Sequence, residues 1–200
     1  MRTGPLSIIA FCSVLVTAAA FRAVLSEEAA LAEEPMHVEA AVHAEEEWSR
    51  FRGPNGQGQS EATTIPTEWT EADYNWKIEL PGIGHSSPVV WGDKVFVTSA
   101  DPETAMQHVL CIDAATGHKL WQRDFPSATY HVHQQNNFAS STPALDDKRI
   151  YFAFASVDEF ALLALTHNGE DVWRINLGTF KTEHGFGTSP IVVGDQVIIT

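Results

Sequence analysis

Three stretches of the chain repeat one pattern of polar and apolar positions. They read SSPVVWGDKVFVTS from Ser86, STPALDDKRIYFAF from Ser141 and TSPIVVGDQVIIT from Thr188. In each stretch Ser or Thr precedes a proline, and a two-residue turn containing aspartate separates two short apolar runs. Glycine reaches the positive φ angles of tight turns and aspartate tolerates them, so each stretch is predicted to form a β-hairpin.

The prolines that open these hairpins suit the first position of a strand, where a missing N–H does no harm. They recur at intervals of 55 and 47 residues and are Pro88, Pro143 and Pro190.

A second repeated element follows the first two hairpins: HVLCIDAATGHKLWQRDF from His108 and FALLALTHNGEDVWRINL from Phe160. In both copies an apolar run leads to a turn, and a tryptophan stands four residues after the glycine of that turn. The pairs are Gly117 with Trp121 and Gly169 with Trp173. Four short strands in each unit predict an all-β propeller of four-stranded antiparallel blades, with the tryptophan packed between blades. A β-sandwich is the alternative, but it does not explain units repeated in register.

Residues 75–80, Asn-Trp-Lys-Ile-Glu-Leu, resemble the last strand of a blade, with Trp76 in the place of Trp121. They precede the first hairpin, so the other strands of their blade are expected from sequence beyond residue 200. A closed propeller leaves no exposed blade face. The chain is therefore interpreted as the N-terminal part of a longer protein, with about three blades of an incomplete ring.

The motif from Cys111 to Gly117, with Asp113 at its centre and Trp121 after it, resembles the blade signature of the pyrroloquinoline-quinone-like (PQQ-like) repeat propellers. The second copy is one residue shorter and has threonine in place of the aspartate. Residues 48–54, Trp-Ser-Arg-Phe-Arg-Gly-Pro, and residues 84–88 are similar to secreted bacterial, BamB-like members. The family includes quinone-dependent alcohol dehydrogenases, an outer-membrane assembly lipoprotein and sensor domains of kinases, so the resemblance implies a fold rather than an activity.

Residues 1–20 have the features of a secretory signal peptide. Arg2 precedes an apolar run from Leu6 to Phe21, and small residues stand at Ala18–Ala20. The run is shorter than the roughly 20 residues that span a bilayer. Cleavage after Ala20 is expected, and retention as a membrane anchor is the alternative.

An acidic linker is predicted at residues 21–47. Eight glutamates and no Lys or Arg lie between Ser26 and Glu47, and Pro35 interrupts any helix. A helix that binds a partner is the alternative interpretation. The PQQ-like propeller domain is then expected over residues 48–200.

The amino-acid composition limits the classes of partner that the chain is expected to bind. The chain has 26 acidic and 12 basic residues, a formal charge of −14, which argues against nucleic acid and against adhesion to an anionic membrane. No membrane span is expected beyond the signal segment. Only Cys12 and Cys111 are present, which excludes a disulfide scaffold and a cysteine-based zinc site.

The resemblance implies that a quinone-dependent dehydrogenase would carry an adjacent cysteine pair, calcium ligands and a catalytic aspartate. This chain has no adjacent cysteine pair, so neither PQQ nor another cofactor is predicted. Asp146-Asp147 aligns with the other hairpin turns and is interpreted as a turn rather than a calcium site. The Ser/Thr-Pro hydroxyls are interpreted as partners of backbone groups at strand starts rather than as nucleophiles. No catalytic residue and no metal site are predicted.

Four histidines stand in the connections between one blade's outer strand and the next blade's inner strand: His85, His131, His133 and His184. Such connections lie on one face of a propeller, so the hypothesis is a ligand site at the rim of the central channel. Unrelated loop histidines are the alternative. The connection between Trp121 and Pro143, which contains Asn136-Asn137, is the longest and is expected to carry a binding surface.

The sequence is interpreted as an exported, non-enzymatic β-propeller that acts as a binding or scaffold module in the periplasm or cell envelope. Its expected partners are other envelope proteins or an unknown small ligand. A quinone-dependent oxidoreductase and the extracytoplasmic sensor domain of a longer receptor are the alternatives.

Overall fold

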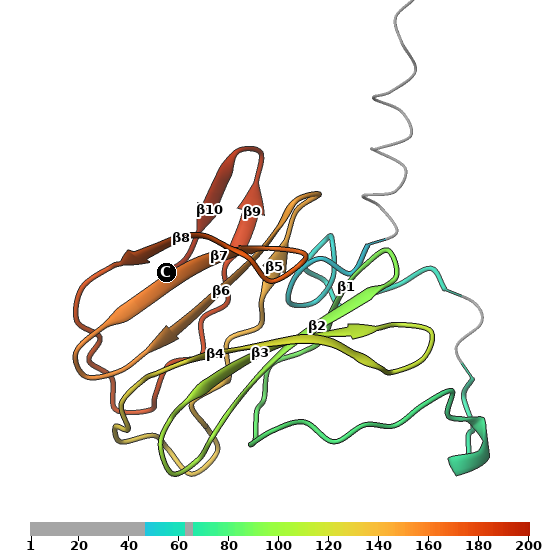
Figure 1. Ribbon diagram of the computed structural model, residues 1–200, viewed down its shortest axis with the longest axis horizontal. Coiled ribbons are helices and arrows are strands. Elements are labelled where there is room, and N and C mark those ends of the chain that lie inside the picture. The colour runs from blue at the N-terminus through green and yellow to red at the C-terminus, as the bar shows by residue number, and fades with distance from the viewer. Residues whose placement is uncertain (1–46, 63–65) are drawn as a thin grey trace, which may run out of the picture. The chain divides into compact units, whose positions relative to one another are not determined.

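The computed structural model describes residues 47–62 and 66–200. The predicted signal peptide, residues 1–20, and all but the last residue of the predicted linker, residues 21–47, lie outside the described residues. The described part is built from strands, with one short 3-10 helix, η1, at Glu71–Asp73. Figure 1 shows the strands gathered into separate sheets. The all-β prediction is therefore confirmed.

The first blade contains four antiparallel strands in chain order. They are β1 (Val89–Trp91), β2 (Lys94–Ala100), β3 (Gln107–Asp113) and β4 (Lys119–Phe125). Strands β1 and β2 form the first predicted hairpin. The last five residues of β2 are all buried, which means that both faces of this strand are covered.

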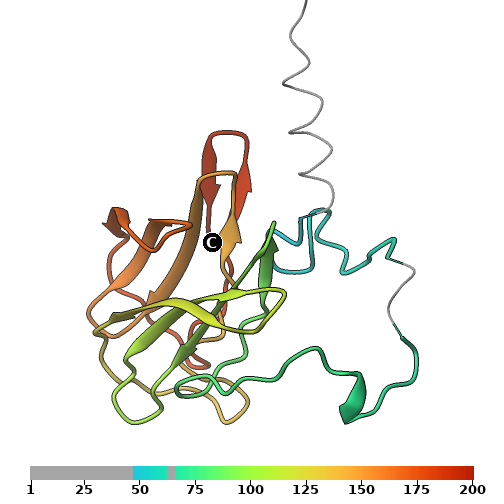
Figure 2. The same cartoon turned by 45° about the vertical axis from the view of Figure 1, so that its right-hand side comes forward.

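The second blade repeats this order with β5 (Ala144–Leu145), β6 (Arg149–Ala155), β7 (Phe160–Thr166) and β8 (Asp171–Asn176). A third hairpin follows, formed by β9 (Ile191–Val193) and β10 (Gln196–Ile198). Figure 2 shows the two four-stranded sheets beside one another, with the third hairpin next to the second sheet. All three predicted hairpins and the division into propeller blades are confirmed.

Both complete blades contain a β-bulge at the same place in the outer strand. In β4 the extra residue is Leu120, immediately before Trp121, and in β8 it is Val172, immediately before Trp173. The side chains of both extra residues are exposed. A bulge shifts the alternation of side chains by one position, so the apolar Leu120 or Val172 faces solvent while the tryptophan after it packs inward.

The tryptophan of the first blade, Trp121, packs on a turn of the second blade, as predicted. A Cβ on Gly169 would lie 2.9 Å from the ring of Trp121, so only glycine allows this approach. The indole N–H of Trp121 donates to the carbonyl of His167 at 2.9 Å. Trp76 packs in the same way over Gly117, and its N–H donates to a carbonyl of that turn at 2.8 Å.

The first and second blades share one apolar core. It contains Val89, Phe96, Val109 and Cys111 from the first blade, and Leu145, Ile150, Phe152, Leu163 and Leu165 from the second. The imidazole of His167 enters this interface, with its centroid 5.3 Å from Phe96 and 5.9 Å from Trp91. Burial lowers the pKa of His167, so the neutral ring is favoured there.

The strand expected at residues 75–80 is not formed. No described strand pairs with this segment, and a strand without a neighbour has no ladder of hydrogen bonds to hold it. Its alternate side chains, Trp76, Ile78 and Leu80, nevertheless pack against the buried cluster of β2 and β3. The apolar pattern therefore correctly predicts which side chains of this segment pack against the blade, but the prediction of a strand is wrong.

Candidate functional site

The innermost strands of the three units are β1, β5 and β9. Strand β1 contacts β5, and β5 contacts β9. Each begins at a Ser/Thr-Pro pair and ends at a hairpin turn. Their starts therefore define one face of the propeller, which we call the loop face (residues 84–88, 126–143 and 177–190). Their hairpin turns define the opposite face, which we call the turn face.

Hydroxyl groups of the repeated Ser/Thr-Pro element join successive blades on the loop face. The backbone N–H of Ser87 donates to Thr142 Oγ1 at 3.0 Å, and the N–H of Thr142 donates to Ser189 Oγ at 3.0 Å. Thr98 Oγ1 also donates to the carbonyl of Ser141 at 3.2 Å. The hydroxyls of Thr142 and Ser189 bond backbone groups at strand starts, as interpreted, whereas the buried hydroxyl of Ser141 has no hydrogen-bond partner among the described residues.

The loop face brings two of the four candidate histidines together. The rings of His133 and His184 meet edge to face, with their centroids 5.5 Å apart. The backbone N–H of His133 and the side-chain amide of Asn136 both donate to the carbonyl of His184, at 3.2 Å and 2.7 Å. Two consecutive connections between blades are thereby joined at this point.

The other two candidate histidines do not join this pair. The backbone N–H of His85 donates to the carbonyl of Ala139 at 3.0 Å, and its side chain is exposed. His131 is also exposed, and no ring contact places it against His133 or His184. Within residues 47–62 and 66–200, no group of three or more His, Cys, Asp or Glu side chains has the arrangement of a metal site.

The Asp146-Asp147 pair lies in the hairpin turn between β5 and β6, as predicted, but the two residues at the tip of the turn are Asp147 and Lys148. The carboxylate of Asp146 accepts hydrogen bonds from the backbone N–H groups of Lys148 and Arg149, at 2.9 Å and 2.8 Å, and from the hydroxyl of Tyr151 at 2.6 Å. Its oxygens are thus occupied in holding the turn between β5 and β6.

The aspartate of the repeat motif has a similar structural role. Asp113 accepts hydrogen bonds from the hydroxyl and the backbone N–H of Thr116, at 2.6 Å and 2.8 Å, and these bonds lower its pKa. In the second blade Thr166 stands at this position. Its hydroxyl oxygen accepts from the N–H groups of Asn168 and Glu170. Threonine therefore replaces aspartate there without loss of the turn.

The turn face carries a feature that sequence reasoning missed, which we call the N-terminal strap (residues 47–54). The carbonyl of Trp48 accepts from the N–H of Val90 in β1 at 2.9 Å, and the carbonyl of Ser49 accepts from the N–H of Leu145 in β5 at 2.8 Å. The strap therefore crosses the inner strands of both blades. The sequence motif of residues 48–54 was a signal for this element, but long-range pairing cannot be read from a single short motif.

Cys111 lies in the core of the first two blades rather than at a surface. Burial raises the pKa of its thiol to about 11, so the group is a neutral thiol at neutral pH. A neutral, buried thiol is neither a nucleophile nor a metal ligand. This cysteine is a packing residue.

The repeated blades and their tryptophan contacts define a propeller of the PQQ-like repeat class. Residues 61–200 match the family model described as "Outer membrane protein assembly factor BamB". The match covers more than half of the chain, and the chain belongs to this family.

Two solved structures align with part of this chain. A europium-containing methanol dehydrogenase aligns with a TM-score of 0.57 and 20% identity, covering 81% of this chain and 29% of that one. BamB from Moraxella catarrhalis aligns with a TM-score of 0.44 and 22% identity, covering 61% of this chain and 35% of that one. The chain spans about a third of the length of each, and these similarities concern the fold alone. A comparison with curated proteins found no match.

In the part of the chain that the structure describes, no helix has the length and hydropathy required to cross a membrane.

Proposed function

We propose that this chain is an exported, non-enzymatic β-propeller that serves as a binding or scaffold module in the cell envelope. The observation that carries the proposal is its membership of a family described by an outer-membrane assembly factor. The positive start at Arg2 and the apolar run from Leu6 to Phe21 support export. These two features together support the proposed location in the periplasm or cell envelope.

We place the binding surface of this module on the loop face. The connection of residues 126–143 is long, yet its backbone is tied to neighbouring connections through Asn136 and Ala139. Loops held by a rigid scaffold are suited to recognition, because little conformational entropy is lost on binding. The exposed His85, His131, His133 and His184 are proposed ligand contacts on this face.

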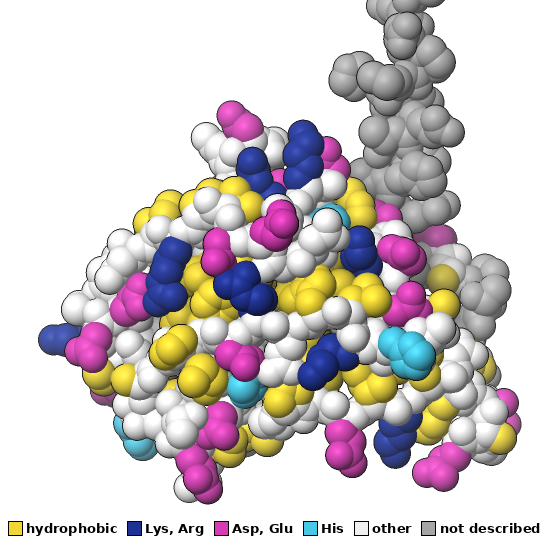
Figure 3. Space-filling view, viewed as in Figure 1, with side chains coloured by type: hydrophobic (Ala, Val, Ile, Leu, Met, Phe, Trp, Pro, Cys, Tyr) yellow, Lys and Arg dark blue, Asp and Glu magenta, His cyan; other side chains and the backbone are white. Residues whose placement is uncertain are grey.

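The proposed partners are envelope proteins or a small ligand rather than nucleic acid. On the face shown in Figure 3, acidic and basic side chains are interspersed, without a continuous basic area. Nucleic-acid binding depends on clustered Lys and Arg that replace counterions. The overall charge of −14 also argues against binding of nucleic acid.

Site-specific crosslinking tests the binding surface. Thr129 is exposed on the loop face and Asp195 is exposed in the third hairpin turn, on the opposite face. In a chain with Cys12→Ser, Thr129→Cys labelled with a maleimide photocrosslinker is expected to form discrete adducts in envelope preparations. Asp195→Cys is the matched control and is expected to form none. The buried Cys111 thiol, with a pKa of about 11, does not compete for the label.

Equal adducts from both positions, or none from either, would contradict the assignment of the loop face.

A quinone titration tests the alternative of an oxidoreductase. The chain with calcium present is expected to show no saturable binding of PQQ by calorimetry or absorbance. The reason is the absence of an adjacent cysteine pair from the sequence and the structural use of Asp146. Saturable binding in the micromolar range would overturn the non-enzymatic proposal.

A further inference from the structure

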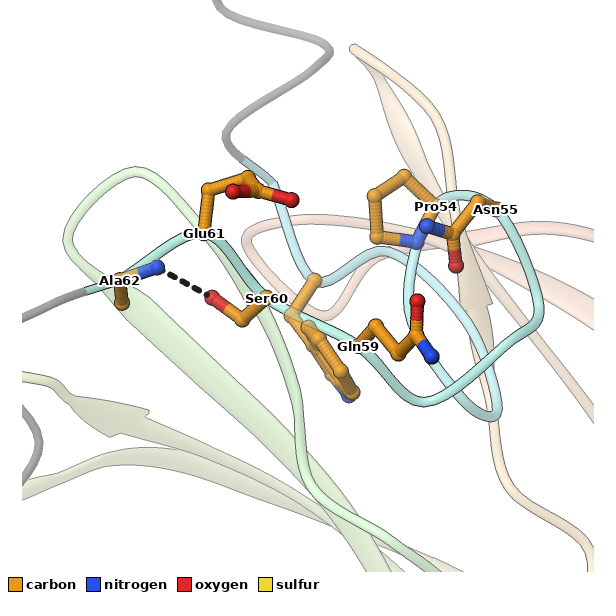
Figure 4. Close-up of a pocket in the computed structure, with 7 residues that line it drawn as sticks. Pro54, Asn55, Gln59, Ser60, Glu61 and Ala62 are labelled. Atoms are coloured by element: carbon orange, nitrogen blue, oxygen red, sulfur yellow. Dashed lines mark hydrogen bonds between the residues drawn. The ribbon is translucent and has the colours of Figure 1, made fainter.

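A pocket of about 500 Å³, lined by both apolar and polar groups, lies at the N-terminal strap. It is lined by Trp48, Pro54, Asn55, Gln59, Ser60 and Glu61. All of these residues belong to one stretch of chain that folds back on itself after crossing the inner strands (Figure 4). None of them belongs to the loop face, so the pocket is separate from the proposed binding surface.

Hydrogen bonds within the loop that forms the pocket hold its backbone in place. Arg50 donates from its guanidinium to the carbonyls of Gly53 and Pro54, at 3.2 Å and 2.6 Å. Arg52 and Gly53 both adopt left-handed backbone conformations, with φ of 64° and 76°, and the N–H of Gly58 donates to the carbonyl of Arg52 at 2.8 Å. A non-glycine residue at positive φ is uncommon, which indicates that the surrounding contacts impose this geometry.

The Trp48 ring, which forms the aromatic wall of the pocket, is also held in a fixed position. A Cβ on Gly53 would lie 2.7 Å from the Trp48 ring, so the glycine backbone packs directly on the indole. The carbonyl of Trp48 is bonded to β1. The Trp48 ring is therefore held in place both through its own backbone and through its contact with Gly53.

The polar wall presents hydrogen-bonding groups of complementary kinds. Figure 4 shows the amide groups of Asn55 and Gln59 near one another on one side of the pocket and the carboxylate of Glu61 on the other side. Amides both donate and accept, and an ionised carboxylate accepts at two oxygens. Pairs of neighbouring hydroxyl groups on a sugar ring match this combination, since each hydroxyl also donates and accepts.

We propose that this pocket binds a neutral carbohydrate, at the size of one or two sugar rings. The apolar face of a sugar would contact the Trp48 indole, and its hydroxyls would bond Asn55, Gln59 and Glu61. An anion is disfavoured because the lining contains a carboxylate and no Lys or Arg. An apolar ligand is disfavoured because it would leave these amide and carboxylate groups without partners.

Calorimetry on the chain with maltose, cellobiose and N,N′-diacetylchitobiose tests the proposal. At least one of the three is expected to bind saturably, with a dissociation constant on the order of 1 mM. Gln59→Ala and Glu61→Gln are each expected to weaken that binding about tenfold, because the first removes an amide that would bond the ligand and the second replaces the charged acceptor of a strong hydrogen bond with a neutral amide. Both residues are exposed, and no hydrogen bond within the described chain involves their side chains, so folding is expected to be unchanged.

Glu103→Gln is the matched control, since Glu103 is exposed in the turn after β2 and remote from the pocket in sequence. It is expected to bind the same sugar with unchanged affinity. Absence of saturable binding to all three disaccharides, or binding that Gln59→Ala and Glu61→Gln leave intact, overturns the proposal. Saturable binding of choline, used as a cation probe, in place of the sugars also overturns it, because the pocket would then be a cation site.

Discussion

Replacement of Trp121 by alanine is expected to lower the free energy of unfolding by about 3–5 kcal/mol, the range for loss of a large packed aromatic side chain. The ring packs on Gly169 of the next blade and lies 6.0 Å from the ring of Phe96, centroid to centroid. Its N–H also satisfies the carbonyl of His167. The substitution therefore removes packing and a hydrogen bond from the same interface. Urea denaturation followed by circular dichroism measures the change.

Trp69→Ala is the matched control, because 60% of the Trp69 surface is exposed. A surface substitution of this kind is expected to change stability by no more than about 0.5 kcal/mol. Trp121→Phe separates the two contributions, since it keeps an aromatic ring and loses the N–H. Similar stability for Trp121→Ala and Trp69→Ala would contradict the role of Trp121 as a contact between blades.

The second large effect is expected at Thr142, whose side chain is 1% exposed. Thr142→Val keeps the shape of the residue and removes the oxygen that accepts from the N–H of Ser87. Leaving a buried donor without a partner costs about 1–3 kcal/mol, so a loss of this size is expected. Thermal unfolding by circular dichroism measures it.

Thr142→Ser is the control for this hydroxyl, because serine keeps the acceptor and lacks only the methyl group. It is expected to retain most of the stability that Thr142→Val loses. Equal loss in both variants would mean that packing of the methyl group, rather than the hydrogen bond between blades, stabilises this position.

Both predictions concern contacts between blades. The same contacts hold the connecting loops of the proposed binding surface in place. The blades are joined by a shared apolar core, by tryptophan packing, by Ser/Thr hydroxyls and by the ion pair of Arg123 with Asp171 at 2.9 Å. Exposed ion pairs contribute little, typically below about 1 kcal/mol. The apolar and hydroxyl contacts are therefore the ones that hold the connecting loops in fixed relative positions.

The sequence by itself determined the hairpins, the blades and the pairing of tryptophan with glycine. These features depend on local chemistry that recurs: turn residues with suitable φ, apolar runs of strand length, and Gly117 and Gly169 at a constant distance from Trp121 and Trp173. Repetition also indicated structural roles for the Ser/Thr-Pro hydroxyls and for the aspartates of the hairpin turns, because a residue type that recurs at one position in every copy belongs to the scaffold.

The tertiary structure alone decided the pairings between distant segments. The strap of residues 47–54 reaches β1 and β5 through backbone atoms, so its short sequence motif does not specify the strands with which it pairs. The meeting of His133 with His184 depends on how two loops of different length cross, and offsets along the chain do not determine this. Residues 75–80 show the same limit: their alternating apolar side chains predicted the buried face, while a strand also requires a neighbouring strand to complete its hydrogen bonds.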